Sequence, residues 1–219
     1  MQKFKCAIFD LDGTLLYTLT SINKAINEAL RICGYPEHPL ERTVDFVNFG
    51  SVELVRRALP EDKRYEEEVM RVHEIYFPIL KKYASDGTKP YDGITDVCKE
   101  LKNNGIVLCV MSNKPQAAAQ TCIDTYFEEG LFDIVRGSVP GEFIKPDAKF
   151  TLDVIRHSGC KNEDCVLIGD SIVDLHTANN AGCPCIWVKW GYGNESNIGG
   201  IPEYTAEKPE DILNIILKS

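Results

Sequence analysis

Two aspartates stand one residue apart at the end of an apolar run near the start of the sequence, IFDLDGTLL at residues 8–16. In an extended chain, side chains two residues apart point the same way, so the carboxylates of Asp10 and Asp12 can face one ligand. An Asx turn would explain a lone pair of this kind, but the Gly13-Thr14 step that follows favours a functional site. Like charges this close raise each other's pKa unless something positive compensates, so we expect a cation, or a proton in transit, at this point.

A second acidic pair, Asp170 and Asp174, follows the apolar run CVLIG at 165–169. The two residues lie four apart where a helix is predicted to begin, so the helix dipole favours each charge while the charges repel each other. A divalent cation would resolve this conflict. Because Ser171 and Asp174 also fit an acidic capping box, we expect Asp170 to be functional and Asp174 to contact a cation indirectly.

Two further segments carry polar residues that suit a phosphate. Ser112-Asn113 follows the run IVLCVM at 106–111, and Ser112 is predicted to be the N-cap of a helix with Pro115 near its first position. A helix N-terminus and a small hydroxyl together can hold a phosphate oxygen. Lys145, in EFIKPDAKF, is equally compatible with binding and with a solvated loop, and Lys149 competes with it.

The elements that must position these residues alternate along the chain. Strand-like runs occupy 5–9, 106–111, 133–137, 165–169 and 185–190, and a helical pattern over 94–101 ends at Asn104-Gly105. This alternation predicts an α/β fold with a doubly wound parallel sheet. In such sheets ligands bind beyond the carboxyl ends of the strands, where the polar residues stand, so the separate segments are expected to converge on one site.

The interval between about residues 15 and 84 interrupts this alternation. It contains an apolar stripe from Ile22 to Cys33, begun by Thr20 or Ser21 and closed by Gly34, then helical patterns at 51–59 and 61–83. Pro78 is expected to kink or split the last of these. We therefore predict a helical insertion of residues 16–83 in a core formed by 1–15 and 84–219.

Composition limits the possible partners and the compartment. The formal net charge of −9 argues against binding to nucleic acid or to an anionic membrane surface. The start of the chain lacks a secretory signal, and no stretch approaches the roughly 20 apolar residues of a membrane-spanning helix. The nine cysteines are an odd number, and several lie in apolar runs, which favours reduced, buried thiols. We therefore expect a cytoplasmic protein.

The motifs taken together resemble the haloacid dehalogenase (HAD) superfamily of phosphohydrolases, and within it the phosphoglycolate phosphatases. FDLDGTLL, VMSN, IKPD and GDSIVD match the four motifs of the superfamily in order and span nearly the whole chain. TKPYDGI, SNKP and LVRRAL add likeness to the phosphoglycolate phosphatase branch, from which Tyr17, Asn48 and Phe49 depart. The resemblance implies a Rossmann-like core and makes the helical insertion a cap that closes over the site.

The resemblance also implies roles for individual residues. Asp10 would be the nucleophile that forms an aspartyl-phosphate, and Asp12 would be the general acid and then base. Mg²⁺ would be held by the side chains of Asp10 and Asp170 and the carbonyl oxygen of Asp12. The phosphoryl oxygens would be bound by Ser112, the Asn113 backbone and Lys145. The implied activity is hydrolysis of a small phosphorylated metabolite.

Several alternatives share these residues. A pyrophosphatase, a nucleotide or sugar phosphatase, or a phosphomutase would keep the same core. A dehalogenase would lack the second acid, Asp12, and a phosphonate-cleaving relative would need a cap lysine, for which Lys24 is the only choice in the first cap helix. A phospho-receiver signalling domain also combines aspartates, a hydroxyl and a lysine, but it would leave the helical insertion unexplained. The sequence does not distinguish a monomer from a homodimer.

Overall fold

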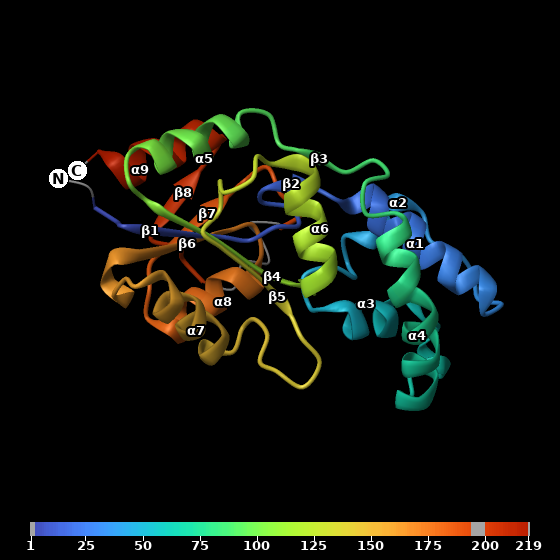
Figure 1. The fold of residues 1–219 in the computed structure, drawn as a ribbon. Helices are drawn as coiled ribbons and strands as arrows, with labels where there is room; N and C mark the ends of the chain where they lie inside the picture. The colour runs from blue at the N-terminus through green and yellow to red at the C-terminus, as the bar shows by residue number, and fades with distance from the viewer. Residues whose placement is uncertain (1–2, 194–199, 219) are drawn as a thin grey trace.

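A six-stranded sheet forms the centre of the larger part of the molecule (Figure 1). The computed structural model describes residues 3–193 and 200–218. In spatial order the strands are β5 (Ile134–Ser138), β4 (Val107–Pro115), β1 (Cys6–Phe9), β6 (Cys165–Gly169), β7 (Cys185–Val188) and β8 (Tyr204–Ala206). Every neighbouring pair runs parallel, which confirms the predicted doubly wound α/β sheet.

The register of the central strands places the polar residues side by side. Phe9, the last residue of β1, pairs with Val110 of β4 and with Ile168 of β6. Asp10 directly follows β1, Asp170 directly follows β6, and Ser112 lies on β4 two residues beyond Val110. Because all three strands run in the same direction, these residues lie together at the carboxyl end of the sheet, as the sequence predicts.

Helices cover both faces of this sheet (Figure 1). On one face, α5 (Ile94–Asn103), α6 (Gln116–Tyr126) and α9 (Pro209–Leu217) share an apolar core with Phe9. On the other, α7 (Ala148–Ser158) and α8 (Ile172–Ala181) pack against Ile8, with the 3₁₀ turn Asn162–Asp164 before β6. Neighbouring residues of β1 thus pack into the apolar cores on opposite faces of the sheet, as expected for a strand buried on both sides.

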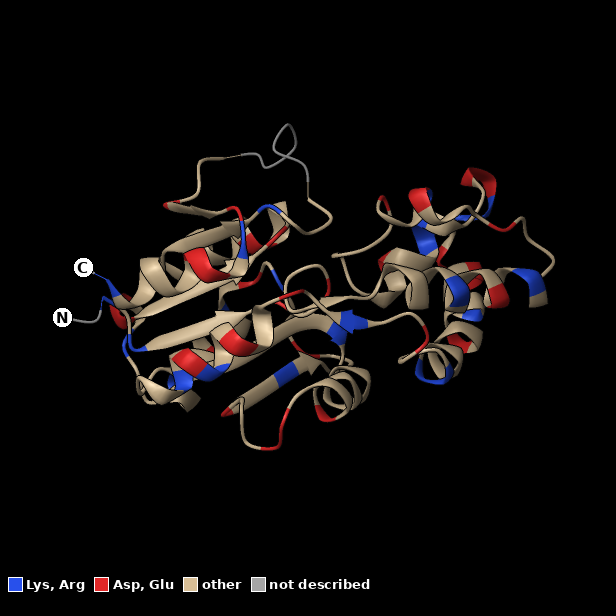
Figure 2. Cartoon of the chain, turned by 90° about the horizontal axis from the view of Figure 1, so that it is seen from above, with Lys and Arg blue, Asp and Glu red and all other residues tan. Residues whose placement is uncertain are grey.

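A separate group of helices, the helical unit, follows the first strand. It consists of α1 (Leu19–Ile32), α2 (Leu40–Thr43), α3 (Ser51–Ala58), the 3₁₀ turn Glu61–Lys63 and α4 (Glu66–Lys82), packed on an apolar core of its own. Two short strands, β2 (Leu16–Tyr17) and β3 (Lys89–Pro90), pair antiparallel where the chain enters and leaves this unit. Figures 1 and 2 show the unit at the end of the core opposite the two chain termini.

Local details of the helical unit differ from the predictions. Pro78 does not split the last helix, because α4 continues from Glu66 to Lys82 with Tyr76 and Leu80 buried on either side of the proline. The first helix begins at Leu19, before Thr20 and Ser21, and no side chain of its own caps it. The hydroxyl of Tyr192 accepts hydrogen bonds from the amides of Thr18 and Leu19 and so replaces the missing cap.

Neither the distribution of charged residues nor the cysteines indicate a specialised role. Acidic and basic residues are interspersed along the helices of both units (Figure 2). All nine cysteines are free thiols in this structure, and most of them are buried. Among the described residues, no helix combines the length and the apolar character that crossing a membrane requires.

Candidate active site

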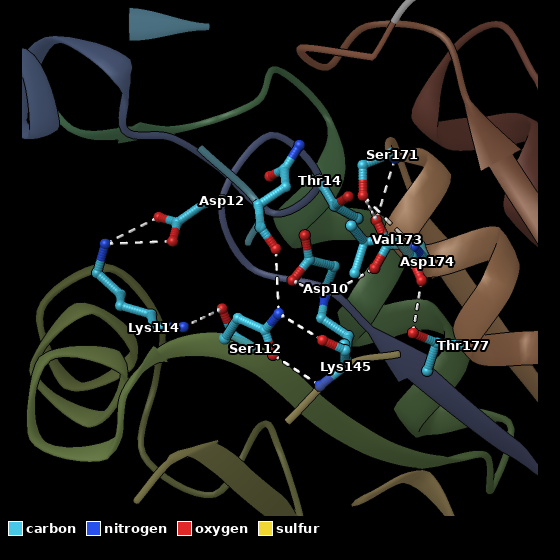
Figure 3. A network of polar contacts seen from close by, with 12 residues as sticks. Asp10, Asp12, Thr14, Ser112, Lys114, Lys145, Ser171, Val173, Asp174 and Thr177 are labelled. Atoms are coloured by element: carbon cyan, nitrogen blue, oxygen red, sulfur yellow. Dashed lines mark hydrogen bonds and ion pairs between the residues drawn. The ribbon is translucent and has the colours of Figure 1, made fainter. Parts of the chain in front are cut away.

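A buried lysine bridges two carboxylates at the end of β1. The Nζ atom of Lys145 lies 2.6 Å from Oδ1 of Asp10 and 2.7 Å from Oδ1 of Asp174 (Figure 3). Lys145 is only 4% exposed, whereas Lys149 is exposed, so Lys145 is the lysine of this segment that lies against the carboxylates. Burial lowers the pKa of Lys145, but the two carboxylates outweigh this effect, and its pKa lies above the usual value.

The loop that carries Lys145 is held by the side chain of Asn113. Oδ1 of Asn113 accepts a hydrogen bond from the amide of Lys145 at 2.8 Å, and Nδ2 donates to the Lys145 carbonyl at 2.9 Å. The same Nδ2 also donates to the carbonyl of Asn48, in the helical unit, at 3.0 Å. The amide side chain of Asn113 therefore ties strand β4 both to the Lys145 loop and to the helical unit, a role that sequence reasoning did not foresee.

Asp12 faces a second buried lysine that the sequence analysis missed. Nζ of Lys114 lies 2.9 and 3.3 Å from the two carboxylate oxygens of Asp12 (Figure 3). Burial lowers the pKa of Lys114, but the charge of Asp12 more than offsets this, and the pKa ends above its usual value. The signal was present in SNKP, because Lys114 follows Ser112 on strand β4 at the same two-residue spacing that separates Asp10 and Asp12.

Ser112 is not the N-cap of a helix, contrary to the prediction. Strand β4 continues to Pro115, which pairs with Ser138 after a register shift, and α6 begins only at Gln116. The hydroxyl oxygen of Ser112 accepts a hydrogen bond from the amide of Lys114 at 3.2 Å. Its hydroxyl hydrogen is therefore available to donate to a bound ligand.

Three carboxylates gather beside the bridging lysine. Ligand atoms of Asp10, Asp170 and Asp174 all lie within 4.8 Å of one another. Asp174 is already fully engaged, because its Oδ2 accepts from the amide and hydroxyl of Ser171 in the predicted capping box and its Oδ1 accepts from Lys145. Among the described residues, these three side chains form the acidic cluster that could hold a metal ion.

Asp170 is oriented from three directions. Its Oδ1 accepts from the hydroxyl of Thr14 at 3.2 Å, and its Oδ2 accepts from the amides of Tyr192 and Gly193 at 2.6 and 3.3 Å. The loop after Asp12 passes close by, since a Cβ atom added to Gly13, whose φ is +91°, would lie 2.5 Å from Oδ2 of Asp170. Glycine is therefore required there both by its φ and by the space.

The charges at the site do not balance within the protein. Four carboxylates, those of Asp10, Asp12, Asp170 and Asp174, face two ammonium groups, so the ionised set carries two negative charges in excess. Burial, and then the neighbouring Asp174, raises the pKa of Asp170 to about 7. Burial also raises the pKa of Asp10 well above its usual value against the opposing effect of Lys145. A divalent cation with a preference for hard oxygen ligands fits both the charge and the donor set.

A small cavity of about 40 Å³ joins the core to the helical unit. The core contributes five residues that the sequence predicts for the site together with two further neighbours on β4, and these are Asp10, Asp12, Ser112, Asn113, Lys145, Lys114 and Pro115. The helical unit contributes Ile22, Val47, Asn48, Gly50, Ser51, Leu54, Tyr76 and Leu80. The predicted residues thus converge on one cavity, with Asp170 and Asp174 next to Asp10, while their individual roles stay predictions.

Comparison with known proteins agrees with this arrangement. The chain belongs to the haloacid dehalogenase-like hydrolase family, whose model matches residues 7–188. A phosphoglycolate phosphatase from Aquifex aeolicus is 28% identical over 95% of each chain, and phosphoglycolate phosphatase 1 from Pseudomonas aeruginosa is 30% identical over 87% of this chain and 71% of its own. The protein is thus an enzyme of the HAD phosphatase type, a phosphoric monoester hydrolase, and the phospho-receiver hypothesis is excluded.

Solved structures share the whole fold. The crystal structure of a candidate phosphoglycolate phosphatase from Lactobacillus delbrueckii subsp. bulgaricus superimposes with a TM-score of 0.92 at 30% identity and covers 100% of both chains. That of a predicted phosphoglycolate phosphatase from Haemophilus somnus gives a TM-score of 0.89 at 25% identity over 98% of this chain and 99% of its own.

Lys24, required by the phosphonate-cleaving alternative, is exposed, pairs with Asp86 and does not line the cavity.

Replacing Asn113 tests its role in holding the Lys145 loop. Asn113→Ala removes three hydrogen bonds and leaves buried groups of Lys145 without partners, so we expect the free energy of unfolding to fall by about 2–4 kcal/mol in urea denaturation. Asn180→Ala is the control, since exposed Asn180 makes one bond to the carbonyl of Pro146 in the same loop and should lose at most about 1 kcal/mol. Equal losses in the two variants would contradict the role of Asn113.

Proposed function

We propose that the protein is a Mg²⁺-dependent phosphatase that hydrolyses a small phosphomonoester, with 2-phosphoglycolate as its first candidate substrate. The observation that carries the proposal is the convergence of Asp10, Asp12, Ser112 and Lys145 on one small cavity beside an acidic cluster. The names of the relatives favour phosphoglycolate. The free thiols of all nine cysteines support action in the reducing cytoplasm.

Asp10 is the proposed nucleophile. Among the described residues, the hydrogen bonds of its carboxylate go to Lys145, which contacts Oδ1 and leaves Oδ2 for attack on phosphorus. Phosphate monoesters hydrolyse very slowly in water, and transfer of the phosphoryl group to a carboxylate divides the reaction into two easier steps. The bridge from Lys145 fixes the orientation of Asp10, because the same ammonium is anchored by Asp174.

Asp12 is the proposed general acid and base. In its protonated form it donates to the oxygen of the departing alcohol, and as a carboxylate it then removes a proton from the water that attacks the aspartyl-phosphate. Its position on the cavity wall next to Asp10 supports this assignment. The presence of this second acid also argues against dehalogenase activity.

The remaining polar groups bind the phosphoryl oxygens. Ser112 supplies its free hydroxyl hydrogen, Lys145 supplies the N–H group not used by its two carboxylates, and the backbone of Asn113 completes the set. These groups place positive charge where negative charge develops in the transition state.

Mg²⁺ is the proposed cofactor, held by the side chains of Asp10 and Asp170 and the carbonyl oxygen of Asp12. When bound, it would neutralise the excess negative charge and polarise the phosphoryl group. Asp174 acts indirectly by holding Lys145 and Ser171. The three hydrogen bonds to Asp170 keep its carboxylate directed at the cluster.

The helical unit is the proposed cap, comprising residues 16–83, over a core of 1–15 and 84–219. It would exclude bulk water and contact the leaving group. The small cavity favours a short substrate over a nucleotide or a hexose phosphate. Pyrophosphate hydrolysis and a phosphomutase reaction are the alternatives within the same chemistry. In the substrate panel below, the first would release phosphate from pyrophosphate, and the second would release phosphate from none of the substrates.

The activity can be tested by phosphate release from a panel of 2-phosphoglycolate, pyrophosphate, hexose phosphates and nucleoside monophosphates. We expect the highest kcat/KM for 2-phosphoglycolate. Asp10→Asn should lower kcat for every substrate by at least about 1,000-fold, because an amide is a poor nucleophile. Asp124→Asn, at an exposed site on α6, is the control and should retain activity. Turnover by Asp10→Asn comparable to the wild type would refute the mechanism, and absence of release from all substrates would refute the function.

Metal binding can be tested without turnover. Because a ligand that binds the folded state stabilises it by mass action, millimolar Mg²⁺ should raise the melting temperature of the wild type progressively. Asp170→Asn removes a charged oxygen ligand from the cluster, so its melting temperature should respond little to Mg²⁺. Asp124→Asn should respond as the wild type does. A full response by Asp170→Asn would show that the cation binds elsewhere.

A further inference from the structure

Lys114 is a buried cation that the proposed mechanism does not use. Its side chain is 4% exposed, and its ammonium contacts both oxygens of Asp12 on the wall of the cavity. Burying an ammonium group costs several kcal/mol, and a single carboxylate offsets this loss incompletely unless further partners are present. An ammonium has three N–H donors, so contact with Asp12 leaves at least one for another acceptor.

The position of Lys114 sets it apart from the other cation of the cavity. Among the described residues that line the cavity, Lys145 and Lys114 are the two with positive charge. Lys145 is committed to Asp10 and Asp174, beside the proposed site of attack. Lys114 lies against Asp12, the residue proposed to protonate the leaving oxygen, and therefore on the side where the alcohol departs.

The opposite wall offers no charged side chain to the leaving group. The described residues that the helical unit contributes to the cavity are apolar or neutral. An anionic leaving group, such as the carboxylate of glycolate, would consequently find no cation on the cap. Lys114, from β4 of the core, is the cation within this part of the cavity that can bind it.

Tyr76 supplies a second, independent indication of a ligand. This residue of α4 is 1% exposed, lines the same cavity, and its hydroxyl has no hydrogen-bond partner among the described residues. Tyr76 lines the same cavity as Lys114 and Asp12, and burial raises the pKa of its hydroxyl. The hydroxyl of Tyr76 is therefore free to hydrogen-bond with a polar group of a ligand in the cavity.

We propose that Lys114 and Tyr76 together bind an anionic group on the leaving alcohol, and so select short phosphomonoesters that carry a carboxylate near the ester oxygen. This inference rests on the proposed phosphatase function and assigns its specificity to these two residues. In the protein without substrate, Asp12 pairs with Lys114. When substrate binds, its carboxylate accepts hydrogen bonds from the remaining donor of Lys114 and from the hydroxyl of Tyr76.

The test compares two substrates that differ only in this charge, 2-phosphoglycolate and its neutral amide, 2-phosphoglycolamide. Charge-assisted hydrogen bonds to a buried partner predict that the wild type prefers the acid by about 30-fold or more in kcat/KM. In Lys114→Met the preference should shrink to within about 3-fold, mainly through KM. Tyr76→Phe should reduce it in part. Lys149→Met, at an exposed lysine outside the cavity, is the matched control and should keep the full preference.

Binding provides a readout that does not depend on turnover. In the Asp10→Asn background, calorimetry should give a lower Kd for 2-phosphoglycolate than for the amide, and the added Lys114→Met substitution should remove the difference. Equal losses for both ligands in Lys114→Met, or no preference in the wild type, would overturn the proposal. Failure of the proposed function has a different signature, since no phosphate would be released from any monoester while the binding comparison would still decide the role of Lys114.

Discussion

The bridge from Lys145 to Asp10 and Asp174 is the interaction on which the site depends. It joins the end of β1 to the start of α8 through a loop that follows β5, the strand at the edge of the sheet. A buried ammonium is tolerated only when it is paired, and the two carboxylates provide that pairing. The position of Asp10, the proposed nucleophile, therefore depends on the Lys145 loop and, through Lys145, on α8.

Asn113 extends this constraint to the helical unit. Its amide holds both backbone polar groups of Lys145 and also the carbonyl of Asn48, a non-glycine residue with φ of +77° that lines the cavity. The side chain of Asn113 thus connects the Lys145 loop to the helical unit, which would contact a leaving group. The antiparallel pair β2 and β3 forms the covalent connections of that wall to the core, so the wall is fixed to the core by two different kinds of link.

The sequence predicted the parts of the structure that depend on short-range pattern. Strand runs with polar residues at their carboxyl ends located the site, and the spacing of Asp10 and Asp12 placed both carboxylates on one cavity while Leu11 entered the core. Strands β2, β3 and β8, of two or three residues each, were not predicted because so few residues show no periodicity. The N-cap prediction for Ser112 failed because pairing with β5 extends β4 beyond the point at which local pattern favours a helix.

Contacts between distant segments could not be read from the sequence. The ion pair of Asp12 with Lys114 joins residues 102 positions apart, and the hydrogen bond from Thr14 to Asp170 spans 156. The register of the strands determines which of these distant residues lie next to each other, and register is a property of the folded sheet. The amides of Tyr192 and Gly193 that hold Asp170 belong to a loop with no recognisable motif, so only the folded chain reveals them.

The central claim, that Asp10 is phosphorylated during turnover, can be tested by trapping the intermediate. Wild-type enzyme is mixed with Mg²⁺ and its best substrate, quenched, and treated with borohydride, which reduces an acyl phosphate to the alcohol and so converts a phosphorylated aspartate into homoserine. Mass spectrometry of the tryptic peptide covering residues 6–24 should then locate homoserine at position 10 and unmodified aspartate at position 12. Homoserine at position 12, or sustained phosphate release with no modified peptide, would contradict the account.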